Sequence, residues 1–115
     1  MNDLPIVILI TVPSKQVGEK IAEVLLEQKV AACVNIIPGI SSIYLWKGSI
    51  NRDEESLLIV KSRAELFEEY LLPIVQAIHP YEVPEIIALP VLMGLPGYLD
   101  WINEVTGGEE STRGL

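Results

Sequence analysis

The sequence is poor in the residues that cross-link chains or hold soft metal ions, because it contains one cysteine, Cys33, and one histidine, His79. A single cysteine excludes an intrachain disulfide and a zinc site built from several thiolates. Cys33 lies in an apolar stretch, so we expect it to be a small buried side chain. A catalytic pair made of Cys33 and His79 would lack an identifiable third residue to orient it.

Signatures of nucleotide-binding and catalytic sites are also missing. The sequence has neither a G-x-x-x-x-G-K-[ST] phosphate loop nor a G-x-G-x-x-G turn. Paired carboxylates are too common in such an acidic chain to indicate a catalytic site. We therefore expect the protein not to be an enzyme and to use no organic cofactor.

Basic residues are scarce, with 8 Lys and Arg against 16 Asp and Glu, which gives a formal net charge of −8. A chain this acidic repels nucleic acid and anionic membranes, so neither is an expected partner. No apolar run approaches the roughly 18 residues of a membrane span. Asp3 stands where a secretory signal would carry positive charge, and we expect a cytoplasmic location.

The sequence does contain enough apolar residues, 50% of the chain, to build one substantial core. We expect a single domain over residues 1–106 and a flexible C-terminal tail over residues 107–115. Hydrophobic periodicity predicts the following elements: a strand at 6–10, a helix at 14–28 with Ser14 as its cap, a strand at 32–37 that bends at Pro38-Gly39 and resumes at 40–46, a hairpin turn at Lys47-Gly48, a strand at 50–60, a helix at 62–79, a strand at 85–89 and a helix at 98–105.

The order of these elements is β-α-β-β-α-β with an extra C-terminal helix, which is the ferredoxin-like pattern of an α+β fold. The two continuous apolar runs, 6–10 and 57–60, suit the two central strands of that sheet, buried on both faces. Ser62 and Glu65 fit a capping box that would begin the second long helix. Pro73 must then kink that helix or begin a new turn.

The expected sheet has more apolar surface than its own helices can cover. Two helices on crossover connections cover one face of a sheet, yet the central strands are apolar on both. The hairpin arms are about 14 residues, or roughly 45 Å when straight, in a domain about 35 Å across. The hairpin must bend back over its own sheet or project and pair with another copy, so we expect a closed homo-oligomer.

Several motifs, in this order, resemble the CutA family of divalent-cation tolerance proteins: 31–35 (AACVN), 37–39 (IPG), 42–48 (SIYLWKG) and 79–86 (HPYEVPEI). The resemblance runs from about Pro5 to Asn103. It implies a homotrimer of ferredoxin-like subunits with an architecture similar to that of PII signalling proteins, in which long hairpins pair between neighbours. It also implies a cytoplasmic role in tolerance of copper and other divalent metal ions.

The sequence departs from this family at one proposed copper site. Some bacterial members are proposed to bind copper through a cysteine in the first strand and two consecutive histidines before a Pro-Tyr pair. Ile10 and Ile78 occupy the first two of those three positions here, and only His79 carries over. That site is therefore incomplete in this chain.

His79 and Glu82 are the candidate ligands for Cu²⁺ or another divalent cation, with Glu85 close by in sequence. Neutral imidazole is a ligand for Cu²⁺ and Zn²⁺, and the carboxylates could supply oxygens. The alternative is that His79 ends a helix, where positive charge on the imidazole is favourable. One histidine with carboxylates binds metal weakly unless an oligomer brings sites together.

A second candidate site is a cleft between subunits lined by Trp46, Lys61, Tyr81 and Glu85. Trp46 could stack a ligand or pack against a neighbouring subunit. Lys61 could bind an anion or pair with Glu85, or be a plain lysine at a strand end. The segment 81–85 could line the cleft or serve only as a stiff connection to the last strand.

Two functions follow from these candidates. The first is a trimeric divalent-cation tolerance protein that binds copper or another divalent metal ion. The second is a PII-like signalling or scaffolding trimer that binds a small ligand or a partner protein in its clefts.

Overall fold

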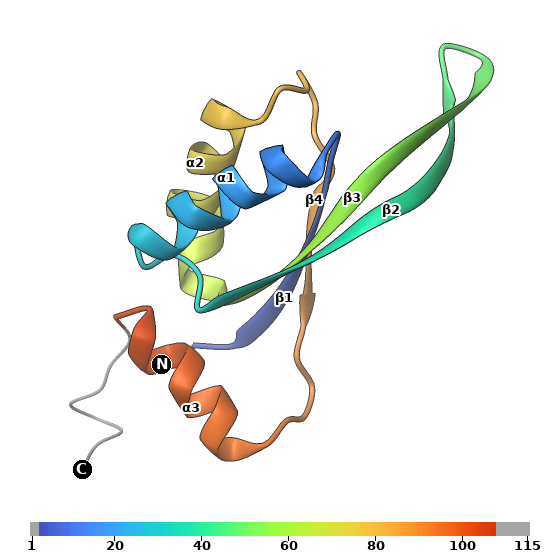
Figure 1. Cartoon of the computed structure of the whole chain (residues 1–115). Coiled ribbons are helices and arrows are strands. Elements are labelled where there is room, and N and C mark those ends of the chain that lie inside the picture. The colour runs from blue at the N-terminus through green and yellow to red at the C-terminus, as the bar shows by residue number, and fades with distance from the viewer. Residues whose placement is uncertain (1–2, 108–115) are drawn as a thin grey trace.

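The computed structural model describes residues 3–107. These residues form a four-stranded antiparallel sheet and three α-helices (Figure 1). The predicted tail, apart from Gly107, lies outside the described residues. The elements are, in chain order, β1 (Pro5–Val12), α1 (Lys15–Glu27), β2 (Cys33–Trp46), β3 (Ser49–Arg63), a 3₁₀ turn η1 (Ala64–Leu66), a π-helical turn η2 (Phe67–Leu71), α2 (Leu72–Ile78), β4 (Ile86–Pro90) and α3 (Pro96–Val105).

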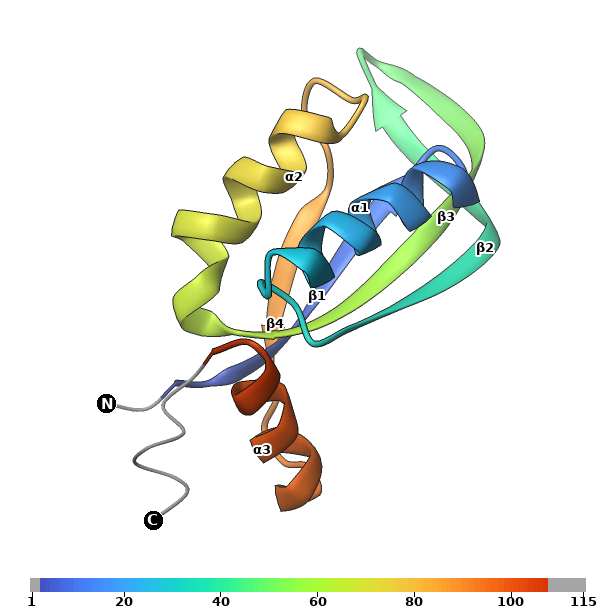
Figure 2. The same ribbon diagram turned by 60° about the vertical axis from the view of Figure 1, so that its left-hand side comes forward.

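The strand order is β2-β3-β1-β4, so the two strands with continuous apolar runs are central, as predicted. Both helical crossovers place α1 and α2 on the same side of the sheet (Figure 2). The ferredoxin-like prediction is confirmed. Gly18 in α1 makes this packing close, because a Cβ there would lie 2.9 Å from Leu58 of β3.

Only one face of the sheet is buried by the chain itself. Burial alternates strictly along β1, where Ile6, Ile8, Ile10 and Val12 are buried and the residues between them are half-buried. The predicted burial of the second face, which requires neighbouring copies, therefore stays a prediction. The register of the strands gathers the remaining apolar side chains on the opposite side, which we call the open face: Val7, Leu9, Ile37, Leu57, Ile59, Ile87 and Leu89.

The β2–β3 hairpin projects beyond the rest of the sheet (Figure 1). Pairing of β1 with β3 ends at Val12 and Ser56, and beyond that point β3 pairs with β2 alone. The molecule is consequently long, with extents of 55 × 26 × 22 Å. Apolar side chains near the tip stay in solvent, since Leu45 is 72% and Ile50 70% exposed.

Backbone geometry at two places shapes this hairpin. A bulge interrupts the β2–β3 register between Ile37 and Ile40, and Gly39 adopts φ +74° there. This confirms the predicted irregularity at Pro38-Gly39, since glycine takes positive φ without steric cost. At the tip Lys47 and Gly48 have φ of 51° and 79°, the positive values that a type I′ turn requires.

The connection between β3 and α2 differs from the predicted helix. The predicted capping box at Ser62 is wrong, because Ser62 belongs to β3 and its hydroxyl donates to the Val30 carbonyl at 2.6 Å. Helical structure begins at Ala64, and α2 starts with Pro73 in its first turn. The helical backbone runs without a break through Pro73, and the π-helical turn before it accommodates the missing proline N–H. The break expected as one outcome for Pro73 is therefore not observed.

Arg63 fastens α3 to the end of the sheet where β1 begins and β3 ends. Its guanidinium is buried and donates to the Thr106 hydroxyl at 2.8 Å and to the Thr106 carbonyl at 2.9 Å. It also pairs with the carboxylates of Asp3 and Glu65. The carbonyl contact satisfies an acceptor at the C-terminal end of the helix, where positive charge is also favourable.

We expect Arg63→Met to lower the free energy of unfolding by about 3 kcal/mol, because it leaves the buried Thr106 carbonyl without its donor and the Asp3 carboxylate without its positive partner. Chemical denaturation at a fixed protein concentration measures this change. Arg52→Met on the exposed hairpin is the matched control, with an expected change within about 0.5 kcal/mol. Equal losses in the two variants would show that Arg63 does not hold α3.

Candidate functional site

The segment between α2 and β4 turns back over the end of β1 and is held there by His79. The imidazole Nδ1 accepts a hydrogen bond from the backbone N–H of Tyr81 at 3.1 Å, so the proton resides on Nε2. Nε2 donates to the Thr11 carbonyl at 2.8 Å. His79 is buried, and its ring lies 4.8 Å from that of Tyr81, centroid to centroid. Both nitrogens are thus engaged within the chain.

Tyr81 joins this segment to the hairpin. Its hydroxyl donates to a carboxylate oxygen of Glu55 at 2.7 Å. Glu55 is 8% exposed even though it lies on the projecting strand β3. Desolvation, and then the hydrogen bond and charge of Glu55, raise the pKa of the Tyr81 phenol.

A second phenol–carboxylate pair lies further along the hairpin. The Tyr44 hydroxyl donates to Asp53, which stands opposite Ser42 in the neighbouring strand. This hydrogen bond to a carboxylate raises the pKa of Tyr44. Both phenols therefore stay protonated at neutral pH and act as donors to carboxylates.

These side chains border a groove of about 760 Å³ between the hairpin and the α2–β4 segment. Four carboxylates, two phenols, one indole and three hydroxyls face it, and no Lys or Arg side chain of the described residues lines it. Its lining residues are Thr11, Ser41, Ser42, Ile43, Tyr44, Trp46, Asp53, Glu55, Tyr81, Glu82, Val83 and Glu85.

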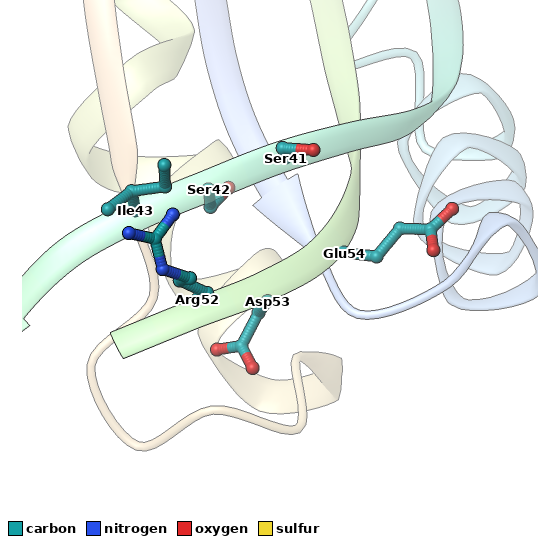
Figure 3. Close-up of a pocket in the computed structure, with 6 residues that line it drawn as sticks. All are labelled: Ser41, Ser42, Ile43, Arg52, Asp53 and Glu54. Atoms are coloured by element: carbon teal, nitrogen blue, oxygen red, sulfur yellow. The ribbon is translucent and has the colours of Figure 1, made fainter. Parts of the chain in front are cut away.

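The hairpin also carries a smaller hollow of about 290 Å³, drawn in Figure 3. Arg52 reaches toward Ser42 and Ile43, whereas the Glu54 carboxylate points away from it (Figure 3). The hollow shares Ser41, Ser42, Ile43 and Asp53 with the larger groove. Because it mixes one cation with two exposed carboxylates on a thin ribbon, it offers no focused charge of either sign.

The structure brings together three of the four predicted cleft residues. Trp46, Tyr81 and Glu85 line the groove. Lys61 does not, since it lies six residues along β3 from Glu55, about 20 Å in an extended strand, and its ammonium donates to Asn35. The predicted pairing of Lys61 with Glu85 is therefore absent in the single chain.

Of the two predicted metal ligands, only Glu82 lines the groove. Glu82 is exposed and faces the groove, whereas His79 is buried behind it. Within residues 3–107, no three His, Cys, Asp or Glu side chains are grouped so as to hold a metal ion. A metal ion at His79 would have to replace one of its two hydrogen bonds.

The sequence prediction overlooked Glu55 as a groove residue. Glu55 belongs to the acidic run Asp53-Glu54-Glu55 of the hairpin. Alternation along a strand places Asp53 and Glu55 on one side and Glu54 on the other, and this signal could have separated them. The partner of Glu55, Tyr81, is 26 residues away, so no local pattern pointed to their contact.

The family model described as CutA1 divalent ion tolerance protein matches residues 6–105. The "Divalent-cation tolerance protein CutA" of Thermus thermophilus is 52% identical over 101 residues, which are 88% of this chain and 97% of that protein. The "Protein CutA, chloroplastic" of Arabidopsis thaliana is 48% identical over 101 residues. Those residues are 88% of this chain but 55% of the plant protein.

Solved structures of these proteins have the same fold. The Thermus thermophilus divalent cation tolerance protein superposes with a TM-score of 0.88 and 51% identity, over 90% of this chain and 100% of the other. A structure from Archaeoglobus fulgidus, described as a periplasmic divalent cation tolerance protein, gives a TM-score of 0.86 at 46% identity, over 90% and 99% of the two chains. The sheet, its helices and the long hairpin are therefore a shared architecture of divalent-cation tolerance proteins.

This chain belongs to the CutA1 divalent ion tolerance protein family, as its sequence motifs predicted. Among residues 3–107, none of the helices has the length and apolar character needed to cross a membrane.

The raised pKa of Tyr81 predicts a loss of stability at high pH. The folded-state pKa lies above the unfolded value of 10.0. The stabilisation is thus fully present below that value and is lost as the pH rises toward the folded-state pKa. In a spectroscopic titration, Glu55→Gln should bring tyrosinate formation to lower pH, because the charge is removed while an acceptor for the phenol remains. Glu54→Gln is the control, and an equal effect of both variants contradicts the assignment.

Proposed function

We propose that this protein is a homotrimeric divalent-cation tolerance protein that binds Cu²⁺ or another divalent metal ion. The observation that carries the proposal is family membership across residues 6–105, nearly the whole described fold. Two features of the chain support the assembly and the metal binding separately.

The open face supports assembly with further copies of the chain. Ile37, Ile87 and Leu89 are each more than 40% exposed on it, and a contiguous apolar patch of this kind marks an interaction surface. The outer hairpin adds unpaired strand edges, which another strand can extend. A closed ring of identical subunits covers both without leaving a surface for further growth.

Light scattering at micromolar concentration should therefore give a particle of three times the 12.7 kDa mass of one chain. Ile59→Glu places a charge in the middle of the open face and should shift the particle toward the single-chain mass, since a buried unpaired charge is costly. Leu26→Glu, on the solvent side of α1, is the control and should leave the assembly intact. A single-chain mass for the unmodified protein would refute the assembly.

His79 and Glu82 are close in sequence, and they support metal binding because they offer an imidazole nitrogen and a carboxylate oxygen. The Nδ1–amide hydrogen bond of His79 is the longer of its two contacts, 3.1 Å against 2.8 Å, so Nδ1 is the nitrogen that a metal ion would take more readily. Two ligands make a weak site, and water or a neighbouring subunit must complete it.

Titration of tag-free protein with Cu²⁺ tests this site. We expect His79→Ala and Glu82→Gln each to weaken the affinity by about tenfold, the effect of losing roughly 1.4 kcal/mol of ligand binding. Glu82 is exposed, so its variant tests the site without disturbing the buried contacts of His79. Glu27→Gln at the end of α1 is the charge-matched control. Unchanged affinity in both site variants would sink the assignment of these ligands.

A second candidate function is a PII-like module that binds a small ligand in the groove. The specific observation in its favour is that Trp46, Tyr81 and Glu85 line one hollow of about 760 Å³, within the volume typical of small-molecule sites.

The cytoplasmic location and the absence of catalytic activity stay predictions.

A further inference from the structure

Lys61 brings a positive charge to the apolar open face. It is half-buried, and the strand register places it opposite Val7 and two positions along β3 from Ile59, both open-face residues. Its ammonium donates to the neutral side chain of Asn35, and none of the described carboxylates forms an ion pair with it. A copy that covers the open face would move this ammonium out of water, which is unfavourable unless the same copy brings an anion.

Glu85 is an unpaired carboxylate on the same side of the sheet. It is exposed, comes directly before β4 and lines the groove beside Thr11, which alternates with the buried residues of β1. Among the described residues its carboxylate has no hydrogen-bond or ion-pair partner, whereas Asp53 and Glu55 each accept from a tyrosine. Glu82 is also unpaired in this part of the chain but lies three residues further from the strand. Of the groove carboxylates, Glu85 is therefore the one that the sheet edge can present to a neighbour.

Lys61 and Glu85 cannot meet within one subunit, because they belong to opposite edges of the sheet. In the strand order β2-β3-β1-β4, Lys61 of β3 reaches outward to Asn35 of the edge strand β2, and Glu85 stands before the other edge strand, β4. Lys61 is opposite Val7. Glu85 directly precedes the residue that pairs with Ile10, so the two side chains are also separated by four positions along β1, about 13 Å. Their charges are complementary only between copies.

The C-terminal helix adds a donor at the Lys61 edge. Tyr98 of α3 lies beside Cys33, which is the register partner of Lys61. Desolvation, and then the neighbouring Cys33, raise the pKa of the Tyr98 phenol. The phenol therefore stays protonated at neutral pH, and together with the Lys61 ammonium and the Asn35 amide it makes this edge rich in hydrogen-bond donors. A carboxylate is the group that such an edge accepts best.

A closed ring of like subunits joins unlike surfaces, since each subunit contacts its two neighbours through two different patches. The β2 edge with its donors and the β4 edge with its free carboxylate are such a pair of patches. We propose that Lys61 of one subunit pairs with Glu85 of the next, so that a lysine from a neighbouring copy completes each groove. The inference rests on the proposed homotrimer and names a charged contact within it.

Charge reversal with rescue tests this contact. Lys61→Glu and Glu85→Lys each set like charges against each other in the ring, and each should raise the concentration at which the trimer half-dissociates by about a hundredfold. The double variant restores opposite charges and should return that midpoint to within about tenfold of the value for the unmodified protein. Light scattering over a dilution series measures the midpoint, and circular dichroism checks the fold of each variant.

Mixing the two single variants shows whether the contact lies between chains. Lys61→Glu carries a carboxylate at both positions and Glu85→Lys an ammonium at both, so most contacts in a mixed ring join opposite charges. The mixture should therefore assemble at a lower concentration than either variant alone. Lys20→Glu and Glu23→Lys, on the exposed side of α1, are the matched controls and should change the midpoint by less than about twofold.

The results that would overturn this contact are separable from a failure of the homotrimer. A single-chain mass for the unmodified protein would remove both. A trimer whose midpoint is unaffected by Lys61→Glu or by Glu85→Lys would keep the assembly and refute the contact. Loss of assembly in the single variants without recovery in the double variant or in the mixture would also refute it, since exchanging the charges does not rescue an edge that is merely destabilised.

Discussion

The structure depends on one mismatch of surfaces: the central strands are apolar on both faces of the sheet, but α1 and α2 cover only one face. The helix α3 packs only at one end of the other face, where Tyr98 lies beside Cys33 and Arg63 binds Thr106. The helices α1 and α2 bury the side of Ile8 and Leu58, and nothing in the described chain covers the middle of the open face. Each apolar side chain moved out of water contributes about 1.5–3 kcal/mol. The uncovered residues are therefore the largest source of stabilisation still available to the protein, and association with like chains is the direct way to use it.

The hairpin extends the same argument beyond the sheet. Its outer half has no third strand beside it, and its bulge at Gly39 turns it away from the direction of the inner half. A two-stranded ribbon is marginally stable in water by itself. The ribbon of this chain is braced at one side by the bond from Tyr81 to Glu55, so the α2–β4 segment helps to define the shape of the hairpin.

Local patterns predicted the elements well and their contacts less well. The run at 6–10, the Ser14 cap and the Lys47-Gly48 turn each specify their own backbone, and the structure confirms all three. The Ser62 capping box is also a local pattern, but Ser62 pairs as part of strand β3 in the structure. Its hydroxyl donates to the Val30 carbonyl instead of capping a helix. Lys61 lies outside the groove of the single chain, because proximity of two strand ends in a topology does not give distance along the strand.

The contact between Glu55 and Tyr81 shows why a groove residue can escape a prediction made from sequence alone. A carboxylate in an acidic run is normally solvated, and only the return of the chain 26 residues later buries this one beneath Tyr81. The same contact ties the two candidate functions together. A neighbour that pairs with the free hairpin edge would fix Glu55, and through Tyr81 it would fix the backbone that carries both His79 and Glu82. The Tyr81–Glu55 hydrogen bond therefore links the hairpin to the segment that carries both proposed metal ligands.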